Sequence, residues 1–203
     1  MPQLNDLRIR ELALEKGMIQ PFHGSLVREL VSVENDILTS LKVLSFGTSS
    51  HGYDIRLSQS DFRIFRHIPG QVMDPKKFDS RYLEKIECVH SDEGSYFILP
   101  AHSYALGVAV EALNVPRNII VVCVGKSTYA RCGVIVNVTP AEAGWIGHLT
   151  LEFSNSSDAD CRIYAGEGVA QLLFFEGDEC VTSYADRQGK YQFQSSQVVP
   201  AKV

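Results

Sequence analysis

One acidic residue in the sequence is placed where it could act as a general base. Glu152 lies in the segment 148–154, whose polar and apolar residues alternate. In a strand, this alternation turns Glu152 to one face and three apolar side chains to the other. A carboxylate held on a rigid strand beside a polar cavity can take a proton from water. The alternative is an acid that pairs with a cation across the sheet.

A group of cations and hydroxyls lies in the segment 125–131, which reads Gly-Lys-Ser-Thr-Tyr-Ala-Arg. The glycine permits a sharp turn, after which Ser127 or Thr128 can cap a short helical turn. In that turn Ser127 and Arg131 lie four residues apart on one face, beside Lys126, and offer donors for a phosphate. The alternative is a capped turn in which Arg131 forms a structural ion pair.

Motifs for metal-dependent or cofactor-dependent chemistry are absent from the sequence. A Walker phosphate loop needs a glycine five residues before Gly125, where Ile120 stands. A zinc-dependent nucleobase deaminase needs His-x-Glu, and none of the six histidines is followed two residues later by glutamate. The Rossmann, zincin and nucleophile-elbow motifs are missing as well. The sequence therefore predicts chemistry without a protein-ligated zinc or other metal.

The elements that must position these residues are mostly strands. Asn5 or Asp6 can cap a short helix that Gly17 ends, and this is the one helix that the sequence predicts clearly. From Gly52 onward, short apolar segments are separated by turn residues, which is typical of an antiparallel sandwich, jelly roll or barrel. The expected strands are 52–57, 62–66, 96–100, 103–110, 119–124, 133–138, 148–153, 161–165 and 169–176.

The composition predicts one soluble domain in the cytoplasm. The chain has 203 residues, of which 45% are apolar and 21% charged, enough to bury a core without disulfides. Its five cysteines are scattered and form no C-x-x-C pair, as expected in a reducing compartment. The net charge of −5 argues against nucleic acid and anionic membranes as partners. We also expect no signal peptide and no membrane span.

Three further features surround the two candidate groups. The alternation in 134–139 gives that strand a core face and a half-polar face, on which Asn137 lies. The loop Pro140–Trp145 follows this strand and should lie near the mouth of any site. Trp145 can stack on a ligand or cover the core, and the core role is favoured. Gln171, inside an apolar strand, must find hydrogen bonds if it is buried.

Several blocks of the sequence match one enzyme family in order along nearly the whole chain. The blocks are GKSTYARCG at 125–133, VNVTP at 136–140, HLTLEFSN at 148–155 and GKYQ at 189–192, with weaker matches at 17–19, 50–56, 74–78 and 115–117. Together they closely resemble the dCTP deaminase family, within the trimeric dUTPase superfamily. The pair KSTYAR and LEFSN is the most specific part of this resemblance.

The resemblance implies a fold, a reaction and partners. The fold would be a distorted β jelly roll with a short N-terminal helix, a single domain over 1–203, assembled as a homotrimer with active sites shared between adjacent subunits. The reaction would be metal-free hydrolysis of dCTP at cytosine C4, giving ammonia and dUTP for thymidylate synthesis. Mg²⁺ would arrive with the triphosphate, and dTTP is a candidate feedback inhibitor.

The resemblance also implies roles for single residues. Glu152 is similar to the family's catalytic acid and base, while Ser127 and Arg131 are similar to residues that position it, the water and the nucleotide. The tail, about 185–203, would close over bound nucleotide as a lid. The further residues implied to line the nucleotide site are Lys126, Thr128, Tyr129, Ala130, Thr150, Leu151, Gln171, Tyr184, Lys190 and Gln194.

Two departures and three alternatives accompany this resemblance. Phe193 stands where members of the family often have glycine, and the segment 105–109, with Gly107 and Val108, lacks a basic residue that they often carry. A bifunctional enzyme would continue from dUTP to dUMP and pyrophosphate. A plain dUTP pyrophosphatase is disfavoured because Val136 stands where an aspartate is usual. A non-enzymatic nucleotide-binding trimer is disfavoured by the three intact catalytic residues.

Overall fold

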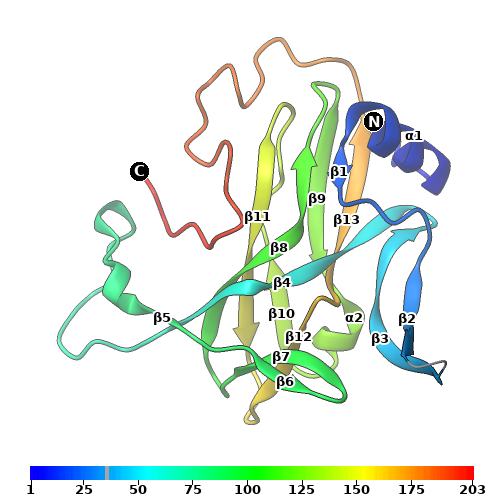
Figure 1. Ribbon diagram of the computed structural model, residues 1–203. Helices are drawn as coiled ribbons and strands as arrows, with labels where there is room; N and C mark the ends of the chain where they lie inside the picture. The colour runs from blue at the N-terminus through cyan, green and yellow to red at the C-terminus, as the bar shows by residue number, and fades with distance from the viewer. Residues whose placement is uncertain (35–36) are drawn as a thin grey trace.

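Strands dominate the computed structural model, which describes residues 1–34 and 37–203 (Figure 1). The helical elements are α1 (Asp6–Lys16), α2 (Ser127–Ala130) and the 3-10 turns η1 (Pro75–Lys77) and η2 (Ser80–Tyr82). The strands are β1 (Ile19–Gln20), β2 (Val27–Glu34), β3 (Ile37–Ser49), β4 (Gly52–Phe65), β5 (Leu83–Lys85), β6 (Val89–Ser91), β7 (Gly94–Leu99), β8 (Tyr104–Asn114), β9 (Ile119–Gly125), β10 (Val134–Asn137), β11 (Ile146–Asn155), β12 (Cys161–Ala165) and β13 (Gly168–Glu176).

Two antiparallel sheets form the body of the protein. The larger sheet has the central order β10-β11-β8-β4-β13-β9, and β1, β2, β3 and β5 join it at its sides. The smaller sheet has the order β12-β7-β6. The core between them is rich in aromatic rings, with Phe62 stacked on Phe97 at 4.7 Å and tilted against Phe153 at 5.5 Å. The prediction of a mostly β, jelly-roll-like fold is confirmed.

The predicted elements are present with one merger. All nine expected segments coincide with strands apart from single residues at their ends, but 52–57 and 62–66 belong to the single long strand β4. The N-terminal helix is also confirmed: the Asn5 side chain accepts from Arg8 N at 3.0 Å, and Gly17 ends the helix at φ 63°. The strand β4 can continue through both predicted segments because its hydrogen-bond partners, and not the local sequence pattern, decide where it ends.

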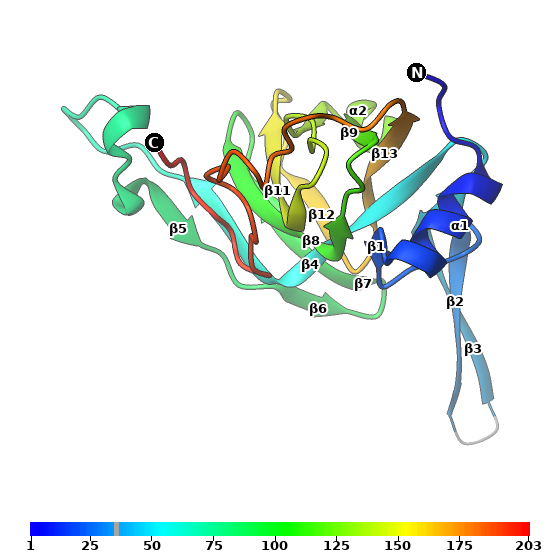
Figure 2. The ribbon, with the colours of Figure 1, turned by 90° about the horizontal axis from the view of Figure 1, so that it is seen from above.

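The β2–β3 hairpin is an arm that the sequence did not predict. It extends away from the body (Figure 2), and β2 pairs with β3 alone among the described strands. Between Ser25 and Phe46 the sequence has no glycine and no proline, and its only Asn and Asp residues are the turn-forming pair Asn35-Asp36. The tip residues 35–36 lie outside the described residues.

Strand β8 crosses the core so closely that residue 107 has no room for a side chain. A Cβ on Gly107 would lie 2.6 Å from Leu57 Cδ1 and 3.1 Å from rings of Phe62 and Phe153. The neighbouring Val108 is fully buried. Gly107 and Val108, which depart from the family pattern, are thus both packed among apolar side chains.

A buried ion pair joins β4 to β8. The Glu111 carboxylate is fully buried and accepts from Arg56 Nε at 2.8 Å and from the Arg56 backbone N at 2.9 Å. The Arg56 guanidinium also lies over the Phe46 ring at 4.7 Å. Burial still raises the pKa of Glu111, although the Arg56 hydrogen bonds act in the opposite direction.

We therefore expect Arg56→Ala to lower the free energy of unfolding by about 3–5 kcal/mol, because it leaves a buried carboxylate without its cation. Since burial raises the pKa of Glu111, protonation at low pH relieves this penalty, so the loss should grow as the pH rises. Urea denaturation at pH 4 and pH 7, at one fixed protein concentration, measures both effects.

Arg66→Ala is the matched control for this substitution. Arg66 pairs with Glu84 at 3.5 Å, but both side chains are more than half exposed. The control should change the free energy of unfolding by less than about 1 kcal/mol. An equal loss in the two variants would contradict the buried-pair argument.

The described residues contain no helix long and apolar enough to cross a membrane. All five cysteines have free thiols, and only Cys132 is exposed among them.

Candidate active site

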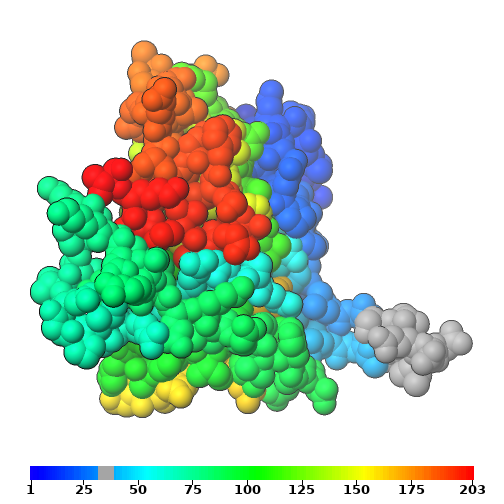
Figure 3. All heavy atoms as spheres, turned by 60° about the vertical axis from the view of Figure 1, so that its left-hand side comes forward, coloured from blue at the N-terminus to red at the C-terminus, as the bar shows by residue number. Residues whose placement is uncertain are grey.

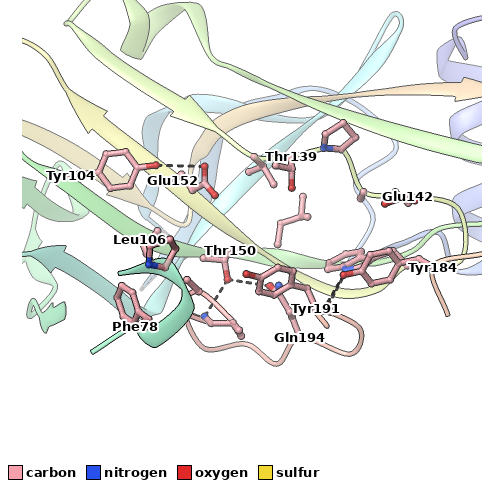
Figure 4. A pocket seen from close by; sticks show the side chains of 18 of the residues that line it. Phe78, Tyr104, Leu106, Thr139, Glu142, Thr150, Glu152, Tyr184, Tyr191 and Gln194 are labelled. Atoms are coloured by element: carbon pink, nitrogen blue, oxygen red, sulfur yellow. Dashed lines mark hydrogen bonds between the residues drawn. The ribbon is translucent and has the colours of Figure 1, made fainter. Parts of the chain in front are cut away.

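A cavity of about 890 Å³ opens beside β11 (Figure 4). Leu149, Thr150 and Glu152 of β11 form one wall, and the loop that ends at Trp145 forms another. Phe65 at the end of β4 and Phe78 after η1 form a further part of the lining, and residues of the C-terminal tail cover one side of the cavity. The loop Pro140–Trp145, predicted to lie near the mouth of any site, lines this cavity. The predicted core role of Trp145, which is 4% exposed, is confirmed.

Glu152 projects into this cavity from the half-polar face of β11, where the structure shows the predicted alternation of buried and half-buried residues. Its Oε2 accepts from Asn137 Nδ2 at 3.0 Å and from Tyr104 Oη at 3.5 Å. Asn137 lies directly opposite Glu152 in the β10–β11 ladder. No cation pairs with Glu152 among the described residues, so the expected alternative of an ion pair across the sheet is wrong.

Tyr104 is the second donor to this carboxylate. Its ring packs edge-on against Phe65 at 5.4 Å, and its hydroxyl faces Glu152 (Figure 4). Burial and the neighbouring carboxylate raise the pKa of Tyr104 to about 12. The hydroxyl therefore keeps its proton at neutral pH and remains a donor.

Lys126 and Gln171 form a separate polar cluster around Asp54. Lys126 Nζ pairs with Asp54 Oδ2, and both side chains are largely buried. Gln171 Nε2 donates to Asp54 Oδ1 at 3.1 Å and to Ser49 Oγ at 3.2 Å. Gln171 is half-buried, and its side-chain hydrogen bonds are thus supplied inside the chain.

The segment 127–131 forms the predicted helical turn α2. Arg131 N donates to Ser127 O at 3.1 Å, which places these residues one turn apart. The prediction that Ser127 or Thr128 caps this turn is wrong, because Lys126 occupies the N-cap and no side chain forms a hydrogen bond there. The Arg131 side chain is exposed and, within 1–34 and 37–203, forms no ion pair.

Tyr129 anchors this turn to the core. It is 3% exposed, and its hydroxyl accepts from Tyr164 N at 2.8 Å. Leu151, between Thr150 and Glu152 in β11, is fully buried. Tyr129 and Leu151 can therefore offer a ligand only backbone groups, whereas Ser127, Thr128 and Ala130 are exposed on α2.

Within one chain, α2 and Glu152 do not meet. None of the residues 126–131 lines the cavity. The turn leads into β10 at Val134, which pairs with Asn155, whereas Glu152 pairs with Asn137 at the other end of that ladder.

The C-terminal tail lies along β11 as a layer on the surface (Figure 3). Phe193 N donates to Ile146 O at 2.8 Å, and Trp145 Nε1 donates to Tyr191 O at 2.9 Å. Thr150 Oγ1 donates to Gln194 Oε1 at 3.1 Å, which brings these two predicted site residues together at the cavity. The tail thus packs on the body of its own chain.

Two other predicted site residues, Tyr184 and Lys190, make contacts with the tail. The Tyr184 hydroxyl accepts from Tyr191 N at 3.0 Å, and both tyrosines line the cavity. Lys190 Nζ donates to the backbone oxygen of Lys202 at 2.7 Å and lies over the Tyr191 ring. Lys190 does not line the cavity.

Phe193 adopts a left-handed backbone conformation with φ 58°, and its ring is mostly exposed. We expect Phe193→Gly to favour the packed tail, because glycine adopts this conformation without the steric cost of a Cβ. Trypsin or thermolysin cleavage within the tail should slow about 2- to 5-fold. Phe193→Ala removes the ring but keeps the strain, so it should give no such protection.

The comparisons with known proteins identify the family. Residues 3–177 match the dCTP deaminase-like family. The chain belongs to this family. It is 49% identical over 197 residues to the dCTP deaminase of Dechloromonas aromatica (strain RCB) and 48% identical to that of Alcanivorax borkumensis, with 97% of each chain covered.

A solved structure supports the fold. The 2'-deoxycytidine 5'-triphosphate deaminase from Agrobacterium tumefaciens superposes with a TM-score of 0.57 at 16% identity. The match covers 93% of this chain and 52% of that one, so this chain spans about half its length. The likeness places this member of the dCTP deaminase family in the same β fold.

Asn137 and Tyr104 are the site residues that the sequence prediction missed. Asn137 stood on the half-polar face of its strand, which was a usable signal, but nothing local aligned it with Glu152. Tyr104 reaches Glu152 from the other neighbouring strand, where Leu106 is the residue opposite Glu152. The register of three strands sets this contact, and no short motif encodes it.

Proposed function

We propose that this chain hydrolyses dCTP to dUTP and ammonia, with Glu152 as the proton-transfer residue. The observation that carries the proposal is the position of Glu152: a half-buried carboxylate, held by neutral donors, on the wall of a cavity of about 890 Å³. The family and the near-50% identity to proteins named dCTP deaminase support the substrate. The product dUTP would serve thymidylate synthesis.

The reaction requires two proton movements that one carboxylate can perform. Water attacks C4 of cytosine as Glu152 takes one of its protons and passes that proton to N3. The resulting intermediate collapses when the C4–N4 bond breaks, and Glu152 carries the hydroxyl proton to the departing amine, which leaves as ammonia. Positioned groups and fixed dipoles must lower this barrier.

We further propose that Ser127 and Arg131 reach the site from an adjacent subunit of a homotrimer. Ser127 is exposed on α2 and Arg131 is exposed at its C-cap, and Arg131 has no ion-pair partner among the described residues. Arg131 would bind the triphosphate, with Lys190 from the tail. Lys126 would join them only after leaving Asp54, its partner within the chain. The tail, about 185–203, would act as the lid, with Gln194 and Tyr184 facing the nucleotide.

Mg²⁺ is proposed to enter with the triphosphate as its counter-ion. In the ranges 1–34 and 37–203, no three His, Cys, Asp or Glu side chains gather into a metal site. The phosphate oxygens and water would therefore supply the ligands of this ion. We also propose that the protein is cytoplasmic and that dTTP inhibits it.

One assay tests the proposed function. The protein is incubated with dCTP and Mg²⁺, and ammonia, dUTP, dUMP and pyrophosphate are followed together. We expect ammonia and dUTP in equal amounts. Accumulation of dUMP and pyrophosphate would indicate the bifunctional alternative. Nucleotide binding without any ammonia would indicate a non-enzymatic binding protein and overturn the proposal.

A further inference from the structure

We propose that Asn137 and Tyr104 are positioning residues that orient the carboxylate of Glu152. Both donate to Oε2, which leaves Oε1 as the oxygen that exchanges protons with water and substrate. This inference rests on the proposed function and assigns the orientation of its central residue.

The two donors hold Glu152 from both sides. In the sheet, β11 lies between β10 and β8, so Asn137 approaches from one neighbouring strand and Tyr104 from the other. Both donate to Oε2, at 3.0 Å and 3.5 Å. Among the described residues, Oε1 accepts no hydrogen bond. Oε1 is thus the oxygen left for a water or a base at the cavity wall.

Without these donors the carboxylate would rotate freely. The last torsion of a glutamate is broad and roughly two-fold, so nothing intrinsic distinguishes its two oxygens. Two donors that converge on one oxygen fix this torsion and point the other oxygen into the cavity. A general base gains from such fixation because the proton must be taken at hydrogen-bond distance along a defined line.

The neutrality of the donors suits a residue that must both take and return a proton. An arginine or lysine in their place would favour the ionised carboxylate and oppose the protonated intermediate. The Asn137 amide cannot ionise, and the Tyr104 hydroxyl stays protonated, because burial and Glu152 raise the pKa of Tyr104 to about 12. Both groups therefore remain donors throughout the cycle.

The longer contact should contribute less than the shorter one. We expect Asn137→Ala to lower kcat for ammonia release about 10- to 30-fold, and Tyr104→Phe, which keeps the ring on Phe65, about 2- to 5-fold. KM for dCTP and the thermal midpoint should change little in either variant. Ile135→Val is the matched control, since Ile135 lies on the same exposed face of β10 but opposite Ser154.

A double-mutant comparison separates positioning from general structure. In the Glu152→Gln background there is no carboxylate to orient, so Asn137→Ala should leave the residual rate within about 2-fold. Asn137→Ala with wild-type kcat would overturn the inference. Loss of thermal stability or a raised KM in place of a lowered kcat would also overturn it.

The same set of variants distinguishes this inference from the proposed function. If wild-type protein releases no ammonia from dCTP, or if Glu152→Gln keeps the full rate, the proposed function or its mechanism fails. If Glu152→Gln is inactive but Asn137→Ala and Tyr104→Phe are fully active, the function stands and the positioning role is wrong.

Discussion

Glu152→Gln will lower kcat for ammonia release from dCTP by at least about 10²-fold. Glutamine keeps the size and the hydrogen-bonding capacity of the side chain but cannot accept a proton from water. Because Asn137 and Tyr104 already occupy Oε2, the substituted side chain should keep its place in the cavity. Nucleotide binding should therefore survive, as measured by calorimetry with dCTP.

Glu93→Gln is the control for this change. Glu93 is an exposed acid that pairs with Arg162 at 2.7 Å and does not line the cavity. This variant should deaminate dCTP at the wild-type rate. Ammonia release by Glu152→Gln at a rate near the wild type would remove Glu152 from the mechanism.

Mixing two inactive variants will restore activity if the site is shared between subunits. Arg131→Ala and Glu152→Gln should each lose nearly all activity alone. In a ring of three subunits, each site would take Glu152 from one copy and Arg131 from the next. Random mixing in equal amounts then leaves roughly a quarter of the sites with both native residues, so roughly a quarter of the wild-type rate should return.

The mixed sample is prepared by unfolding the two variants together in urea and refolding them, with each variant refolded separately as the reference. Arg81→Ala mixed with Glu152→Gln is a useful comparison, since Arg81 pairs with Asp79 away from α2 and its variant should be active alone. If Arg131→Ala and Glu152→Gln restore nothing, then Ser127 and Arg131 act in the site of their own chain, or not at all.

The local pattern of the sequence predicted the strands well because most of them bury one face. The alternation around Glu152 placed it on the half-polar face of β11, and the structure agrees. For the β2–β3 arm the only turn signal between the two strands is the pair Asn35-Asp36, without glycine or proline, and this arm was not predicted. The local alternation thus predicted where most strands lie, whereas the hydrogen-bond partners decide how long each strand is, as in β4.

The partners of Glu152 were beyond prediction for a different reason. A hydrogen bond from Asn137 requires the exact pairing of β10 with β11, and the contact with Tyr104 requires the β8 register as well. Shifting either strand by one residue would turn the donor to the other face. The packing of the tail on β11 is equally non-local, since it depends on single contacts such as Thr150 with Gln194.

The last residues of the chain lie beside the cavity, which matters for how the protein is handled. Val198 is buried, its backbone N donates to Asp61 Oδ2 at 2.9 Å, and Ala201 lines the cavity. The N-terminus lies on a different side of the molecule (Figure 1). An affinity tag fused after Val203 would start at the cavity mouth, so a purification tag belongs at the N-terminus.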